Sequence, residues 1–358
     1  MAKKKQTEEV LEDGTEPVKK GKSAASVEEG IAKQFGDNIL VNCNYIFDKK
    51  KVLIPISPSL DLITGKIPSG SFIIFTGKEK VGKSTTSLFF AANAQDIKYK
   101  NEDCEEGRHV YYYNVEGRLK ERDLEGIPHL VRDRFHVIQS VRGKILSASD
   151  YLEIADQLIN EKIGSIHIID SYSALCTNAE KIGTMADMQR ADGPKALAKF
   201  CRKVCNTVPI NDNIVIGVTH VMGNPTGHSE WKEKSGQAIA YQSDVKLKSM
   251  YYEPWTIGQG GPQIGQLVHW QCINTATKTT PGQKTISYIR YGQGIDIIRE
   301  VCELATDIDI IHKSGAWYSS ELLNNQKAQG MENLCELVKN TPGAYDKIYD
   351  KVKETFGI

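Results

Sequence analysis

The sequence predicts an α/β fold with a mostly parallel central sheet, and three observations support this class. Residues 72–75 form an apolar run with strand character, a glycine-rich segment follows at 77–84, and residues 85–94 have helical character. Further apolar runs then alternate with helical segments, which is typical of a parallel sheet covered by helices. The chain has 358 residues, of which 40% are hydrophobic. That is enough for one large domain and a smaller one.

The glycine-rich segment matches a phosphate-binding loop, Gly-x-x-x-x-Gly-Lys-Ser. Glycines allow the backbone to fold around a polyphosphate, which then binds to N–H groups at the start of the next helix. We expect Lys83 to reach the β- and γ-phosphates and the Ser84 hydroxyl to hold Mg²⁺. The residues predicted to bind the nucleotide are Gly77, Lys78, Glu79, Lys80, Val81, Gly82, Lys83, Ser84 and Thr85.

Three further predicted strands end near residues suited to phosphate chemistry. Glu116 follows the strand at 108–113 and is the candidate to polarise an attacking water, with a solvated loop acid as the alternative. Asp170 ends the strand at 166–170, as expected of an acid that binds the Mg²⁺ shell. His220 follows the strand at 213–219 and is a candidate γ-phosphate sensor, with a purely structural histidine as the alternative.

Two polar segments are predicted to be flexible loops, because neither shows a regular apolar period. The first covers residues 176–192, and a basic helix follows it at 194–205. The second covers residues 222–236, and loops of this length inside a compact domain are usually functional. In the second loop, Trp231 beside Lys232 and Lys234 suits stacking on bases with phosphate contacts nearby. A tryptophan that anchors the loop to its own domain is the alternative.

The remaining sequence predicts how the chain is divided. Residues 1–28 are predicted to be a disordered charged arm whose lysines are either a solvated surface or a contact for nucleic acid. A helix at about 25–35 and a lead-in rich in turns extend to residue 70. The core follows at 71–295, with antiparallel strands predicted at 244–250, 265–274 and 284–291. A small α-rich C-terminal domain is expected at 296–358.

Composition limits the remaining possibilities. The formal net charge is zero, with 45 basic and 45 acidic side chains, so nucleic-acid binding would require a local basic surface. The chain shows neither a long apolar span nor an apolar leader at its start, and we expect a cytoplasmic protein without membrane contact. The 8 cysteines lack Cys-x-x-Cys spacing and indicate reduced core residues.

Several of these stretches together resemble the RecA-type recombinases, and most closely the phage branch of the UvsX kind. The resemblance covers about residues 40–358 and is most specific near the C-terminus, in Gly294-Ile295-Asp296 and in Ala316-Trp317-Tyr318. The other matching stretches are Ser59-Leu-Asp-Leu, Gly65-Lys-Ile-Pro-Ser-Gly, the phosphate-binding loop, Tyr113-Asn-Val-Glu, and the run Ile-His-Ile-Ile-Asp-Ser-Tyr-Ser-Ala-Leu that starts at residue 166.

The resemblance implies a DNA-dependent ATPase that uses ATP and Mg²⁺, forms a helical filament on single-stranded DNA and pairs it with homologous double-stranded DNA. By position, Lys83 and Ser84 match the family's phosphate and Mg²⁺ contacts, and Asp170 matches its metal-binding acid. Glu116 matches the catalytic carboxylate. His220 matches the γ-phosphate sensor, where many members have glutamine and the phage branch has histidine.

The two predicted loops, at about 177–192 and 221–236, occupy the places of the family's DNA-binding loops. Their sequences differ too much to be matched residue by residue, so the DNA contacts are chosen from side-chain chemistry. Lys278 is the one residue that could replace the lysine pair which bacterial RecA inserts into a neighbouring ATP site, and it lies in a shifted alignment. The chosen DNA contacts are Arg190, Trp231, Lys232 and Lys234.

The resemblance also implies a single-strand-binding protein and a loader as partners, and the cytoplasm of a host cell as the location if a phage encodes the chain. Two other functions are compatible with the same core. One is a hexameric helicase or related motor, and the other is a regulatory ATPase that binds nucleotide without strand exchange.

Overall fold

The computed structural model describes residues 24–48, 51–97, 107–183, 192–223, 231–233, 242–258, 260–277 and 279–357. The chain divides at Lys50 into two compact units, each considered by itself. The described part of the first unit contains the helices α1 (Ala24–Phe35) and α2 (Asn44–Asp48). The predicted disordered arm covers residues 1–28. Residues 1–23 lie outside the described part of the chain, and α1 begins at Ala24, before the predicted end of the arm.

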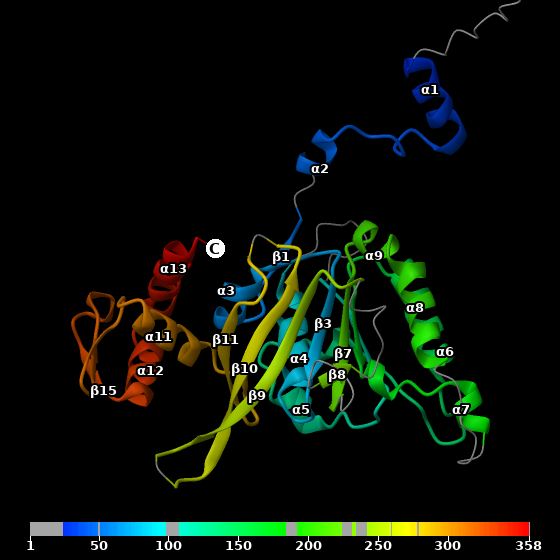
Figure 1. The fold of residues 1–358 in the computed structure, drawn as a ribbon. Coiled ribbons are helices and arrows are strands. Elements are labelled where there is room, and N and C mark those ends of the chain that lie inside the picture. The colour runs from blue at the N-terminus through cyan, green and yellow to red at the C-terminus, as the bar shows by residue number, and fades with distance from the viewer. Residues whose placement is uncertain are drawn as a thin grey trace, which may run out of the picture. The chain divides into compact units, whose positions relative to one another are not determined.

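The second unit is built on one large, mostly parallel sheet (Figure 1). Within the described residues, 10 strands form this sheet, in the order β12-β11-β10-β9-β3-β7-β6-β4-β5, and β8 pairs with β7. Their bounds are β3 Phe72–Gly77, β4 Val110–Asn114, β5 Phe135–Ile138, β6 Ile166–Asp170, β7 Ile214–Gly223, β8 Trp231–Glu233, β9 Val245–Thr256, β10 Gln263–Thr275, β11 Lys284–Arg290 and β12 Gly294–Ile295.

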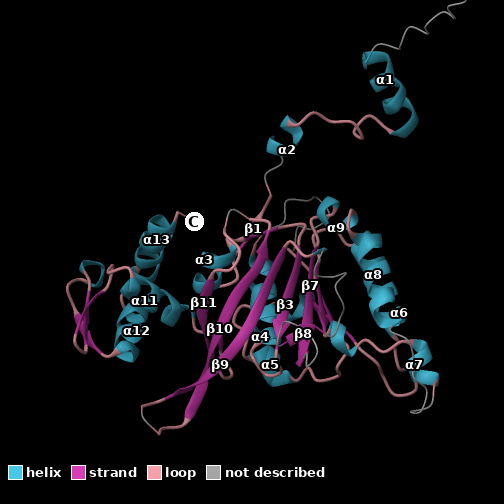
Figure 2. Cartoon of the chain, viewed as in Figure 1, coloured by secondary structure: helices cyan, strands magenta, loops and turns pink. Residues whose placement is uncertain are grey.

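Helices cover both faces of the sheet (Figure 2). Both faces need cover because the apolar side chains of β3 point alternately to each face. Ile73 and Phe75 pack with α4 on one face, while Phe72 and Ile74 pack with α6 and α8 on the other. The helices of this region are α3 Pro58–Thr64, α4 Lys83–Asp96, α5 Glu121–Glu125, α6 Ala148–Glu161, α7 Asn178–Ile182, α8 Asp192–Val204 and α9 Thr207–Ile210. The structure therefore confirms the predicted α/β class.

The lead-in before the core forms short elements, as the spacing of proline and glycine predicts. Strand β1 (Leu53–Ile54) pairs with β2 (Ile67–Pro68), and α3 lies between them. Three short 3₁₀ turns occur elsewhere, at Arg132–Arg134, Tyr172–Ala174 and Glu321–Leu323. None of the helices in the described parts of the chain is long and apolar enough to cross a membrane.

Three antiparallel strands extend the parallel core, as predicted. Strand β9 pairs in parallel with β3 on one side and antiparallel with β10 on the other, and β10 pairs antiparallel with β11. The predicted strand at 244–250 is too short, because β9 continues to Thr256 and forms a long hairpin with β10. Backbone pairing with β10 stabilises this extension beyond the core. An apolar pattern in the sequence cannot indicate such pairing.

The C-terminal residues form helices around a small three-stranded sheet. Glu300 of α11 is fully buried and ties this part to the core, because it accepts hydrogen bonds from the Ser59 N–H (2.9 Å) and the Ser287 hydroxyl (2.6 Å). The bounds are α11 Ile297–Asp307, β13 His312–Ser314, β14 Trp317–Ser319, β15 Lys327–Gln329, α12 Met331–Asn340 and α13 Ala344–Phe356.

Candidate nucleotide-binding site

The phosphate-binding loop joins β3 to α4 at the carboxyl edge of the sheet. Gly82 caps α4 with a φ of 80°, and a Cβ placed there would lie 2.3 Å from Ile289 Cδ1. A Cβ on Gly77 would lie 2.8 Å from the Ser249 carbonyl oxygen. Glycine is therefore required at both positions, because a side chain would collide with the neighbouring strands. The first N–H groups of α4 have no partner within the helix and can bind an anion.

Lys83 lies in the first turn of α4, and only 4% of its surface is exposed. Its ammonium group donates hydrogen bonds to the carbonyl oxygens of Gly77 (3.1 Å) and Lys78. Burial lowers the pKa of Lys83 to about 8, although the nearby carboxylates of Asp170 and Glu116 oppose that change. A buried cation held by backbone carbonyls beside a helix N-terminus is well suited to bind phosphate.

Asp170 ends β6 and lies almost fully buried, directly across from the loop. Its carboxylate accepts hydrogen bonds from the Tyr112 hydroxyl (2.7 Å) and from Ser84. Burial raises the pKa of Asp170 above its usual value, and these two hydrogen bonds act in the opposite direction. The two side chains predicted to bind Mg²⁺, Ser84 and Asp170, are therefore neighbours.

Glu116 lies just beyond β4 at the centre of a polar network. Its carboxylate accepts hydrogen bonds from the Ser171 hydroxyl (2.6 Å) and from His220 Nε2 (2.9 Å), and it lies 3.6 Å from the Arg118 guanidinium. The His220 hydrogen bond is the main reason why the pKa of Glu116 falls to about 2, even though partial burial raises it. Glu116 is therefore ionised at neutral pH, as a group that polarises water must be.

The sequence predicts that the strand ends at His220, and this strand boundary is wrong. Strand β7 continues through His220 to Gly223, with residues 221–223 paired antiparallel to β8. Within the sheet His220 is the register partner of Gly77, and its backbone N–H donates to the Ser173 hydroxyl (2.8 Å). Because the ionised Glu116 only accepts, Nε2 carries the proton. The buried Nδ1 has no hydrogen-bond partner among the described residues.

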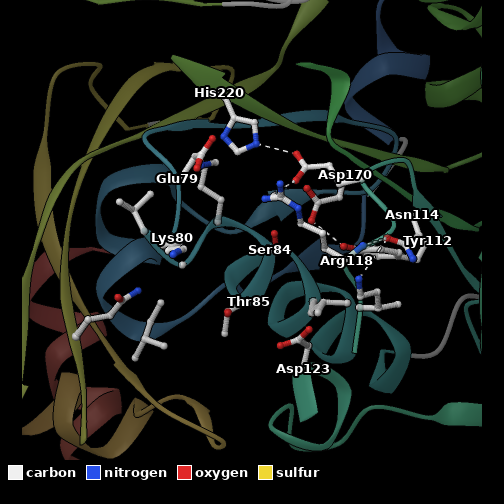
Figure 3. Close-up of a pocket in the computed structure, with 18 of the residues that line it drawn as sticks. Glu79, Lys80, Ser84, Thr85, Tyr112, Asn114, Arg118, Asp123, Asp170 and His220 are labelled. Atoms are coloured by element: carbon white, nitrogen blue, oxygen red, sulfur yellow. Dashed lines mark hydrogen bonds and ion pairs between the residues drawn. The ribbon is translucent and has the colours of Figure 1, made fainter. Parts of the chain in front are cut away.

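These side chains surround one cavity of about 450 Å³ (Figure 3). The figure shows Ser84, Arg118, Asp170 and His220 at its wall. Several lining residues were not predicted from the sequence, and they are Leu88, Tyr112, Asn114, Arg118, Leu119, Asp123, Gln266, Ile289 and Tyr291. A second lobe of about 460 Å³ shares Thr85, Asp123, Ile289 and Tyr291 with the first.

The cavity fits a nucleoside triphosphate with Mg²⁺. The φ of 80° at Gly82 lets the loop turn into α4, and Lys83 and the start of α4 provide cationic and N–H donors. Ser84 and Asp170 provide two oxygen ligands, a number that suits Mg²⁺ held partly by phosphates and water. Across the described parts of the chain, no group of three or more His, Cys, Asp or Glu side chains could hold a metal ion by itself.

The described parts of the two predicted DNA-binding segments contain regular secondary structure. Helix α7 lies inside the first predicted loop, and the hairpin of β7 and β8 occupies part of the second. The rest of both segments, at 184–191, 224–230 and 234–236, lies outside the described residues. Trp231 and Lys232 belong to β8, of which only the backbone is described. Arg190, Lys234 and Lys278 lie outside the described residues.

Comparison with known proteins shows that this chain is similar in sequence to bacterial RecA proteins. Residues 299–357 match the family profile of the RecA C-terminal domain. The chain is 28% identical over 335 residues to Protein RecA of Lactobacillus johnsonii, covering 92% of this chain and 87% of the relative. It is 26% identical over 371 residues to Protein RecA of Thermotoga neapolitana, covering 100% and 96%. For Protein RecA of Bacillus velezensis the identity is 27%, with coverage of 92% and 90%.

The similarity therefore extends along nearly the whole chain and includes both the site and the C-terminal helices. The described order of strands and helices agrees with it, since a mostly parallel sheet with a phosphate-binding loop precedes the matched C-terminal domain. The chain has a RecA-like α/β fold and is similar to RecA proteins along nearly its whole length.

Proposed function

We propose that this chain is an ATP-dependent DNA recombinase that forms a helical filament on single-stranded DNA and catalyses homologous pairing and strand exchange. The observation that carries the proposal is the meeting of Lys83, Asp170, Glu116 and His220 around one cavity, in a chain similar to RecA proteins over 92% of its length. Histidine at position 220 favours the phage branch of this family. Single-stranded and double-stranded DNA, a single-strand-binding protein and a loader are the proposed partners.

In this proposal the chain's own residues share the work of ATP hydrolysis. Lys83 and the N–H groups of α4 bind and orient the phosphates, and Glu116 polarises the attacking water while Ser171 and His220 hold its carboxylate in place. Mg²⁺, held by Ser84 and Asp170, would neutralise charge on the phosphates. DNA contacts are proposed for the two segments at about 177–192 and 221–236.

Strand β7 provides a direct connection between the nucleotide site and the second of these segments. His220 is paired with Gly77 of the phosphate-binding loop and hydrogen-bonded to Glu116. The same strand continues without interruption to Gly223, where it pairs with Trp231 of β8. A change at the γ-phosphate that moves His220 would therefore move the base of the β7–β8 hairpin.

Replacing His220 by alanine is expected to preserve ATP binding and to remove the dependence of DNA affinity on the nucleotide. The reason is that Lys83 and the α4 N-terminus remain, whereas the link from Glu116 to β7 is lost. Fluorescence anisotropy of a labelled single strand, with ATP, with ADP and without nucleotide, measures this effect. His312→Ala, which removes an exposed histidine in β13, is the control. An unchanged nucleotide dependence in His220→Ala would contradict the coupling.

A joint-molecule assay tests the function itself. Single strands are mixed with homologous or non-homologous duplexes, with ATP and without nucleotide, in the presence of a single-strand-binding protein. Joint molecules that require both homology and ATP are the expected result. ATPase activity stimulated by single-stranded DNA without joint molecules, even with a loader added, would instead favour a motor or a regulatory ATPase.

A further inference from the structure

Tyr112 is a buried tyrosine whose hydroxyl reaches the nucleotide cavity. Only 3% of its surface is exposed, it lies on β4, and its hydroxyl donates to Asp170 Oδ2 at 2.7 Å. Strand alternation directs its neighbours Tyr111 and Tyr113 to the opposite face of the sheet. Tyr112 is therefore the tyrosine of this run that lines the cavity.

The hydroxyl is not explained by packing. The ring of Tyr112 lies 6.0 Å from that of Phe135 within an apolar cluster, where a phenylalanine would make the same contacts. A buried hydroxyl is costly unless it is hydrogen-bonded, and the partner it finds is the carboxylate of Asp170. Asp170 is only 8% exposed, so its carboxylate depends on protein donors to fix its orientation.

We propose that Tyr112 is a positioning residue for the magnesium–nucleotide site, because its hydroxyl holds the Asp170 carboxylate in the orientation that faces Ser84. The proposal rests on the function proposed above. It assigns to Tyr112 a role in metal-dependent binding that is separate from its role in the core. Because the hydroxyl donates to Oδ2, Oδ1 of Asp170 is not used by this hydrogen bond and keeps its lone pairs for a hydrated metal ion.

The test is a binding titration of a fluorescent, non-hydrolysable ATP analogue, carried out with increasing Mg²⁺ and with a chelator. Mg²⁺ should strengthen binding of the analogue. Tyr112→Phe is expected to raise the Mg²⁺ concentration that gives half of this effect by about tenfold, which corresponds to the loss of one hydrogen bond to a charged group. Affinity in the chelator should stay within about twofold of the wild type, since the phosphate contacts of Lys83 remain. The matched control is Tyr113→Phe, which removes a buried hydroxyl that contacts His167 instead.

A double-mutant cycle with Asp170→Asn separates positioning from packing. In that background Tyr112→Phe should change the Mg²⁺ dependence by less than about twofold, because the carboxylate it orients is absent. The proposal is overturned if Tyr112→Phe keeps the wild-type Mg²⁺ dependence, or if it weakens binding equally with and without Mg²⁺. An equal effect of Tyr113→Phe also overturns it. If the wild type shows no Mg²⁺-dependent binding, the proposed function itself falls, and this proposal with it.

Discussion

Replacing Lys83 by alanine is expected to reduce ATP turnover by about 10²- to 10³-fold or more. The ammonium group is the buried cation at the start of α4, and it lies beside the carboxylates of Asp170 and Glu116. Its removal takes away the charge that would face the transferring phosphoryl group and leaves those carboxylates to repel the phosphates. Phosphate release in the presence of single-stranded DNA, at saturating ATP, measures the loss.

Lys162→Ala is the matched control, because Lys162 is an exposed lysine at the end of α6 and does not line the cavity. It should hydrolyse ATP at the wild-type rate. Hydrolysis by Lys83→Ala within a few-fold of the wild type would remove the assignment of the phosphate-binding loop. Retained affinity with lost turnover would still fit a role in the transition state.

The lowered pKa of Lys83 adds a pH dependence to the same prediction. In the nucleotide-free protein Lys83 loses its proton as the pH rises through about 8, whereas a bound polyphosphate favours the protonated form. Nucleotide affinity should therefore fall above that pH, by at most about tenfold per pH unit, since one proton is taken up on binding. Lys83→Ala lacks this group and should show no such alkaline decrease. Equilibrium titrations at a series of pH values compare the two proteins.

Local signals explain why much of the fold could be predicted from the sequence. Helix α6 has a clear local signal, because Ser147 and Asp150 form a capping box and an amphipathic pattern follows. Strands β3 and β6 are fully buried, so their apolar runs are unambiguous. The phosphate-binding loop likewise lies within one strand–loop–helix unit. In each case the relevant interactions occur between residues close together in the chain.

The parts of the site that could not be predicted depend on contacts between distant residues. Gln266, Ile289 and Tyr291 reach the cavity because β9 pairs with β3 and brings β10 and β11 beside the phosphate-binding loop. No pattern within β10 or β11 indicates that order of strands. Tyr112 shows a second reason why parts of the site could not be predicted. The sequence of an apolar strand is the same whether its tyrosine only fills the core or also donates a hydrogen bond to an acidic side chain.

The extent of β7 shows a third limit. Residues 221–223 are followed by a polar, glycine-containing stretch, and strand propensity alone ends the strand at Thr219. Antiparallel pairing with β8 extends it, although the extension has no apolar face to bury in the core. This extension places the described start of the predicted second DNA segment in the same strand as His220.

Replacing Glu116 by glutamine is expected to slow ATP hydrolysis by about 10²- to 10⁴-fold while ATP binding and filament assembly persist. Glutamine has nearly the same shape and can still accept from Ser171 or His220, so the cavity should keep its geometry. What is lost is the negative charge that polarises water, a charge that the wild-type carboxylate keeps at neutral pH because its pKa is about 2.

Two measurements on the same sample separate hydrolysis from assembly: phosphate release, and filament formation on single-stranded DNA followed by light scattering and electron microscopy. Glu121→Gln, which changes an exposed acid on α5, is the control and should match the wild type in both. The expected combination is long-lived filaments with little phosphate release, because the proposed function ties assembly to bound ATP, which this variant should retain. Rapid hydrolysis by Glu116→Gln would contradict its role as the catalytic carboxylate. Loss of assembly together with hydrolysis would show that the charge of Glu116 is needed to bind ATP, and the network with Ser171 and His220 would then serve binding and not the attack of water.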